Sequence, residues 1–198
     1  MSDQFDSEPA PPQIPQGEPE LPHLSETNAA AAAPLPERRQ LAPAIYAVAL
    51  ATIVVDQLVK LWIVDSFHLP ALGSVPLLGP IHLSMVWNNG ISFGLLRLDY
   101  PWMRWVLAGF ALAVAAVLAS WARKVERPLL AAAVGLIMGG ALGNFIDRIR
   151  LGAVADFIDV TRLGFPWVFN VADSALSIGI VLLVLDAVRS ELAMKRNA

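Results

Sequence analysis

The chain has 198 residues, of which 56% are hydrophobic and only 16% are charged, whereas soluble globular chains have about 25% charged residues. This deficit indicates a membrane protein, and the absence of cysteine excludes disulfides, thiolate metal sites and a cysteine nucleophile. The net charge of −3 comes from the first 39 residues, and no basic stripe interleaved with aromatic residues suggests nucleic-acid binding.

Residues 1–40 form an acidic, proline-rich segment. Seven acidic residues and two arginines lie in its first 39 positions, together with eight prolines. Too few large apolar side chains are present to offset the entropy of ordering, so we expect this segment to be disordered. It also lacks the basic region followed by an apolar core that marks a signal peptide. The segment is therefore left out of the predicted fold.

Four segments are long and apolar enough to cross a bilayer, which takes roughly 20 residues per helix. The expected spans cover about residues 42–64, 102–122, 128–147 and 171–188. The predicted fold class is membrane all-α, a bundle of four transmembrane helices in a domain of residues 41–190. Residues 191–198 would form a short C-terminal tail.

The basic residues of the loops favour one orientation of these spans. Eight Lys and Arg residues flank the spans on the side of the two termini, against five on the other side. Cytoplasmic loops carry an excess of basic residues, so both termini are expected in the cytoplasm. The segments at about 65–101 and 149–170 then face outward.

The first outward segment has a β-like pattern. Apolar side chains alternate with mostly polar ones over residues 81–88, and turn-forming residues bound this stretch on both sides. Such a pattern predicts a short strand and a hairpin. We expect a small β-rich segment lying on the outer membrane surface.

Polar residues far apart in the sequence share one depth in the expected bundle. At a rise of about 1.5 Å per residue, Asp56 lies about 21 Å into the first span and Asn144 about 24 Å into the third. Asp173 begins the fourth span, and Asp156 lies in the outer loop just before it. With a hydrocarbon core about 30 Å thick, all four reach the outer interface, which is where we expect the functional site.

The third span indicates how this layer is assembled. Gly139 and Gly143 belong to a stripe of small residues that recurs every four positions and ends at Asp147. Small residues at this spacing let a second helix approach closely. The neighbouring stripe would aim Asn144 and Arg148 into the interior of the bundle. Ordinary helix packing that ends in an interfacial Asp–Arg pair is the alternative.

Two further pairs have structural explanations of their own. Asp56 and Lys60 stand in the favourable order for an intrahelical ion pair, and we interpret them as a structural pair that faces the interior. Asn170 and Asp173 stand where a helix N-cap and its third residue would lie, so capping alone would explain them. Because Asp156 is expected at the same interface, we interpret Asn170 and Asp173 as part of a functional site rather than as a helix cap alone.

A pair of carboxylates is the remaining candidate for a catalytic site. No HExxH or comparable metal spacing is present, so neither a metal nor a cofactor is expected. Two carboxylates close together cannot both ionise easily, and one therefore keeps a proton. Such a pair can take a proton from water as it attacks an amide and protonate the departing nitrogen. The enzymatic alternative is a serine–lysine peptidase that pairs Lys60 with Ser92 or Ser174.

Five short stretches occur in order along the chain. They are DQLVK at 56–60, NNGISFG at 88–94, GGALGNFIDR at 139–148, VADFID at 154–159 and FNVADS at 169–174. Together they resemble the lipoprotein signal peptidase family, also called signal peptidase II, over about residues 46–186.

The resemblance implies an aspartic endopeptidase of the bacterial cytoplasmic membrane with its site near the periplasmic interface. Such an enzyme removes the signal peptide from diacylglyceryl-modified lipoprotein precursors and cuts before the lipidated cysteine. The family's catalytic aspartates fall on Asp156 and Asp173. Its lining positions correspond to Asn88, Asn144, Arg148 and Asn170. Its supporting positions include Asp56 and Lys60, to which the stripe of the third span adds Gly139, Gly143 and Asp147.

The expected partners are the lipoprotein precursor and membrane lipid, and the outer β segment is expected to cover the cut site. A small transporter or proton channel is an alternative of another class, with a relay through Asp56, Lys60, Asp147 and Arg148. Its charges would have to occur at several depths, but they gather at one interface. A scaffold protein that binds through its N-terminal segment is the third alternative.

Overall fold

The computed structural model of the chain describes residues 41–90 and 102–196. The N-terminal segment and Ser92, one of the nucleophiles of the serine–lysine alternative, lie outside these residues. A compact unit is assigned to residues 38–198, and the fold below concerns its described part.

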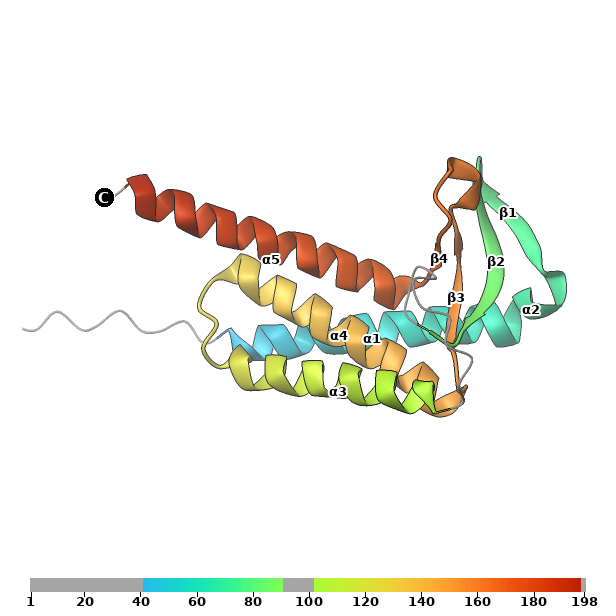
Figure 1. Cartoon of the computed structure of the whole chain (residues 1–198), viewed down its shortest axis with the longest axis horizontal. Helices are drawn as coiled ribbons and strands as arrows, with labels where there is room; N and C mark the ends of the chain where they lie inside the picture. Colours follow the sequence, from blue (N-terminus) through green and yellow to red (C-terminus); the bar gives the residue numbers. More distant parts are fainter. Residues whose placement is uncertain (1–40, 91–101, 197–198) are drawn as a thin grey trace, which may run out of the picture. The chain divides into compact units, whose positions relative to one another are not determined.

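Four helices have the length and apolar composition of membrane spans, which confirms the predicted four-helix fold. They are α1 at Ala42–Leu61, α3 at Met103–Ala122, α4 at Pro128–Arg150 and α5 at Val171–Arg196. A π-helical turn at Trp62–Ser66 prolongs α1. The helices run side by side in Figure 1, and α4 and α5 end three and eight residues later than expected.

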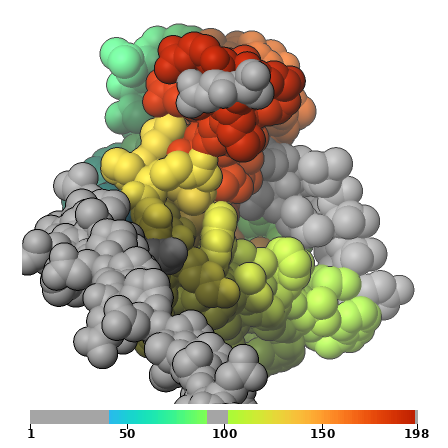
Figure 2. Space-filling model, turned by 90° about the vertical axis from the view of Figure 1, so that its left-hand side faces the viewer, coloured from blue at the N-terminus to red at the C-terminus, as the bar shows by residue number. Residues whose placement is uncertain are grey.

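The helix α4 is the centre of the bundle. In the most apolar 18-residue stretch of α4, 67% of the residues are buried, against 22% to 28% in the corresponding stretches of the other three helices. It packs against α1, α3 and α5. Figure 2 looks at the end of the bundle where α4 begins and shows its start (yellow) between α5 (red) and α3 (green). Side chains on α4 can therefore reach every other span.

The glycine stripe of α4 packs closely on α1, as the sequence predicted. A Cβ at Gly139 would lie 2.6 Å from the Thr52 Cβ and 2.7 Å from the Ala49 carbonyl oxygen. On the neighbouring stripe, a Cβ at Gly140 would lie 2.5 Å from the Ala172 carbonyl oxygen of α5. Because only glycine allows these two approaches, the two stripes fix α1 and α5 against α4.

A four-stranded antiparallel sheet lies at the end of the bundle where α4 ends and α5 begins (Figure 1). Its strands, in spatial order, are β1 at Ser74–Leu78, β2 at Ile81–Asn88, β3 at Val154–Asp159 and β4 at Val168–Phe169. A single-turn helix, α2 at Leu69–Leu72, precedes β1. The strand expected at 81–88 is confirmed, and it forms a hairpin with β1.

The placement of Asp156 in a loop was wrong, because this residue lies within β3. Its Cα pairs with that of Val86 on β2. Aspartate is depleted in strands, and VADFID shows no clean alternation of apolar and polar residues, so the local sequence hides the strand. Its pairing with β2 and β4 supplies the stability that local propensity does not.

Candidate active site

Asn170 joins the two candidate catalytic aspartates. Its side-chain amide donates to Asp156 Oδ1 at 2.7 Å, and its backbone N–H donates to Asp173 Oδ2 at 3.3 Å. The Asp173 backbone N–H donates in return to Asn170 Oδ1 at 2.8 Å, which is the capping arrangement that the sequence predicted. All three residues are buried. Residues from β3 and from the start of α5 therefore meet in one site.

Two further asparagines complete the lining of this carboxylate pair. Asn88, at the end of β2, donates to Asp156 Oδ2 at 2.9 Å. Asn144 of α4 donates to Asp173 Oδ1 at 2.8 Å and accepts from Asn170 at 3.2 Å. The structure thus brings together three of the four predicted lining residues with both aspartates.

Lys60 lies beside this site and is almost fully buried. Its ammonium is 2.8 Å from Asp56 Oδ2, as the intrahelical spacing predicted, and also 2.8 Å from Asp147 Oδ2. It donates to Asn144 Oδ1 at 3.3 Å. Because an ammonium can only donate, it holds the oxygen of this amide toward itself. The Asn144 NH₂ group is thereby turned toward Asp173.

Asp56 and Asp147 each hold the backbone beside one candidate aspartate. Asp56 Oδ1 accepts the N–H of Ala172, next to Asp173, at 2.8 Å. Asp147 Oδ2 accepts the N–H of Ala155, next to Asp156, at 3.1 Å. These two carboxylates therefore attach β3 and α5 to the shared lysine.

Sequence reasoning missed two members of this network. Gln57 donates to Asp147 Oδ1 at 2.9 Å and to Asp56 Oδ2 at 3.1 Å. Arg150 donates to Gln57 Oε1 at 3.2 Å. The sequence offered one signal for Gln57, because its polar amide stands beside Asp56 in a span that is mostly apolar.

Arg148 is buried and bonds backbone carbonyls. Its guanidinium donates to the backbone carbonyl oxygen of Asn144 at 3.2 Å and to that of Gly90 at 3.0 Å. Asp147 pairs with Lys60 instead, so α4 does not end in the Asp–Arg pair of the packing alternative. The guanidinium therefore ties the end of α4 to the residues that follow β2.

Burial and the neighbouring charge of Asp173 raise the pKa of Asp156 from 3.8 to about 7. Hydrogen bonds from Asn88 and Asn170 and the charge of Lys60 oppose this rise but do not cancel it. The Asp156 carboxyl can therefore keep its proton at a much higher pH than an ordinary aspartate. This state suits a carboxylate pair that keeps one proton.

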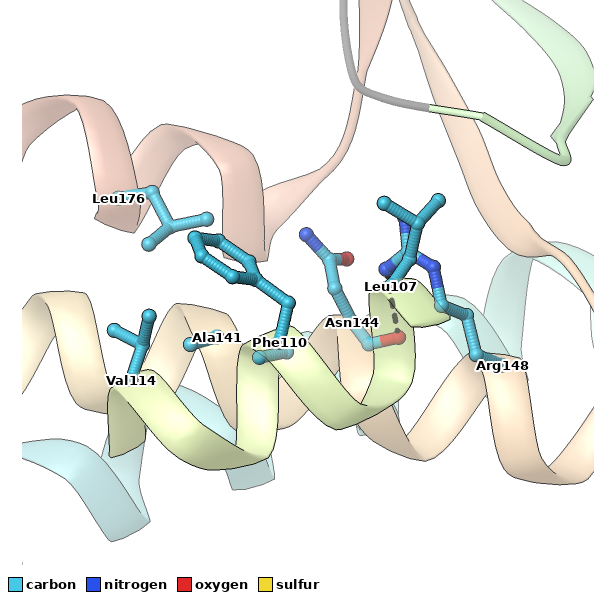
Figure 3. A pocket seen from close by; sticks show the side chains of 8 residues that line it. Leu107, Phe110, Val114, Ala141, Asn144, Arg148 and Leu176 are labelled. Atoms are coloured by element: carbon cyan, nitrogen blue, oxygen red, sulfur yellow. Dashed lines mark hydrogen bonds between the residues drawn. The ribbon is translucent and has the colours of Figure 1, made fainter. Parts of the chain in front are cut away.

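A cleft of about 220 Å³ opens beside the site, with α4 as its floor and α3 and α5 as its walls. Phe110 of α3 points toward Leu176 of α5, while Asn144 and Arg148 lie at the polar end (Figure 3). The remaining lining is apolar and comprises Leu107, Ala111, Val114 and Ala141. The cleft can accept an apolar chain whose polar end reaches Asn144 and Arg148.

The serine–lysine alternative finds no support at Ser174. Its hydroxyl donates to the carbonyl oxygen of Asn170, the residue just before its own helix, at 3.0 Å, and the Lys60 ammonium is paired with two carboxylates.

Within residues 41–90 and 102–196, no group of three or more His, Asp or Glu side chains could hold a metal ion.

Four membrane-length helices and a buried, amide-lined pair of aspartates at one end of the bundle define a multi-pass membrane protein with a polar site. Residues 48–189 match the family model described as signal peptidase (SPase) II. The chain belongs to the signal peptidase II family and is a membrane protease of the aspartic class.

Its relatives include lipoprotein signal peptidases. That of Caulobacter vibrioides is 57% identical over 147 residues, which cover 74% of this chain and 87% of the relative. That of a Methylobacterium species is 42% identical over 146 residues, which cover 73% and 88%. A solved structure of a bacterial membrane enzyme superposes with a TM-score of 0.65 at 27% sequence identity. The match covers 75% of this chain and 90% of the chain of that enzyme.

Proposed function

We propose that this protease removes the signal peptide from diacylglyceryl-modified lipoprotein precursors and cuts immediately before the lipidated cysteine. The observation that carries the proposal is the contact of one residue, Asn170, with both Asp156 and Asp173. The family of the chain and the names of its relatives supply the substrate class.

The chemistry follows from one shared proton. The ionised carboxylate takes a proton from water as the water oxygen attacks the scissile carbonyl carbon, and the protonated carboxyl gives its proton to the departing nitrogen. Because burial and a neighbouring charge raise the pKa of Asp156 to about 7, we assign the proton donor of the pair to Asp156 and the activation of water to Asp173. The amide NH₂ groups of Asn88, Asn144 and Asn170 keep both carboxylates in place.

The cleft provides the binding surface for the precursor. Its apolar walls suit the hydrophobic part of a signal peptide or an acyl chain, because burial of apolar area supplies most of the affinity in such sites. Asn144 and Arg148 stand at its polar end, where the peptide backbone beside the cut would lie. The sheet then covers the cut site and limits access of bulk water.

The proposed topology puts both termini in the cytoplasm and the site near the periplasmic interface. Basic residues at 38–39, in the loop between α3 and α4, and at the end of α5 support this orientation. Residues 41–190 would then form the peptidase domain, with residues 1–40 and 191–198 as cytoplasmic tails.

Cleavage of a diacylglyceryl-modified precursor in detergent or vesicles tests the proposal. Asp156→Asn and Asp173→Asn should each abolish cleavage in protein that still folds and inserts, whereas Ser174→Ala and Ser92→Ala should retain it. Cleavage by both aspartate variants would refute the carboxylate pair. A wild type that cleaves an unmodified precursor equally well would refute the proposed substrate class.

A further inference from the structure

The ends of the two hairpins of the sheet carry a group of exposed apolar side chains, here called the apolar tip. Its members and their exposed fractions are Leu77 at 58%, Leu78 at 74%, Leu163 at 47%, Phe165 at 52% and Trp167 at 39%. The rings of Phe165 and Trp167 stack with centroids 5.4 Å apart. Large apolar side chains gathered on a protein surface commonly mark a contact with a membrane or a partner.

The strand register places both turns at the same end of the sheet. Pro76, His82, Asp159 and Val168 pair in a row across β1, β2, β3 and β4. The end of β1 with its turn at 79–80 and the turn at 160–167 both lie beyond this row, and Figure 1 shows these two hairpin ends together. The apolar tip is therefore one surface built from two hairpins.

The spans fix where this surface stands relative to a bilayer. β4 ends at Phe169, and the membrane helix α5 begins two residues later. At about 3.3 Å per strand residue, the three steps from Trp167 to Asn170 keep Trp167 within about 10 Å of the residue that precedes α5. The apolar tip therefore lies close to the end of a helix with the length and composition of a membrane span.

We propose that the apolar tip inserts into the interfacial layer of the bilayer and anchors the sheet to the leaflet beside α5. Aromatic side chains prefer this layer, and a sheet bearing leucines there removes apolar area from water. Arg162, exposed in the same turn, can bind lipid phosphate. The contact does not depend on the cleavage chemistry, but it sets the height of β3, and hence of Asp156, above the lipid.

Site-directed nitroxide labels test the proposal, because the chain contains no cysteine of its own. Leu78→Cys and Phe165→Cys carry a label at the apolar tip, in protein reconstituted into lipid nanodiscs. Val184→Cys, 56% exposed in the middle of α5, gives the lipid reference. Lys195→Cys, whose native side chain is 71% exposed near the end of α5, gives the aqueous reference. Collision rates with oxygen, which concentrates in lipid, and with a water-soluble nickel chelate are then compared.

The expected ratio of oxygen to nickel collisions at both tip positions lies between the two references and shifts toward the lipid one when detergent is replaced by nanodiscs. A ratio equal to that of the Lys195→Cys label at both positions would overturn the proposal. Protection from both reagents in the presence of precursor alone would also overturn it, because the apolar tip would then bind the substrate. Tryptophan fluorescence during thermal unfolding verifies that each labelled variant folds.

Discussion

Asp156→Asn should stabilise the protein at alkaline pH although it removes a proposed catalytic group. The pKa of this buried carboxyl is raised from 3.8 to about 7 by desolvation and by the charge of Asp173. Between these two values the folded state binds a proton that the unfolded state has lost. The free energy of unfolding of the wild type therefore falls as pH rises from about 4 to about 7 and stays low above it. An uncharged asparagine escapes this loss.

The magnitude follows from the size of the shift. A rise of about 3 pKa units corresponds to about 4 kcal/mol of destabilisation at pH 8. The NH₂ group of the new asparagine cannot accept one of the two bonds from Asn88 and Asn170, which costs about 1–2 kcal/mol. The net gain is about 2–3 kcal/mol at pH 8. It disappears near pH 5, where the wild type has lost only about 1.5 kcal/mol, because the cost of the missing bond offsets a loss of that size.

Thermal unfolding in detergent, followed by the fluorescence of the six tryptophans, measures this difference. A gain of about 2–3 kcal/mol raises Tm by roughly 4–12 °C for a chain of this size, so the variant should melt well above the wild type at pH 8 and within a few degrees of it at pH 5. An equal shift at both pH values, or a variant that melts lower at pH 8, would refute the reasoning.

Three other changes test the site and its frame. Precursor cleavage should decline about tenfold per pH unit above pH 7 as Asp156 loses its proton, and a rate that keeps rising to pH 9 would contradict this assignment. Gly139→Ala should lower stability by about 1–3 kcal/mol because its Cβ meets the α1 backbone, whereas Gly109→Ala, with open space around it, should leave Tm unchanged or raise it slightly. Lys60→Met should cost about 3–5 kcal/mol because two buried carboxylates lose their cation, while Lys195→Met breaks only an exposed pair and should cost less than about 1 kcal/mol.

The spans and the glycine stripe could be predicted because their signals are local. Hydropathy over 20 residues marks a span, and a repeat of four puts Gly139 and Gly143 on one helix face whatever the partner. The ion pair of Asp56 and Lys60 follows from spacing within one helix in the same way. These features need no knowledge of how the helices meet.

Features that depend on long-range pairing could not be predicted in this way. β3 became visible only through its partners, because an aspartate in the middle of VADFID argues against a strand. The bond between Lys60 and Asp147 joins two spans whose relative rotation the sequence does not give. The same applies to buried Asp186 of α5, which pairs at 2.8 Å with Arg127 just before α4.

The position of Lys60 has a mechanical consequence for the pair of aspartates. Asp56 on α1 and Asp147 on α4 meet at a single ammonium, and each holds the chain next to one member of the pair. A shift of α1 along α4 must break this junction before it can part Asp156 from Asp173. The bonds of this junction come from α1, α4, β3 and α5, whereas α3 supplies the apolar wall of the cleft.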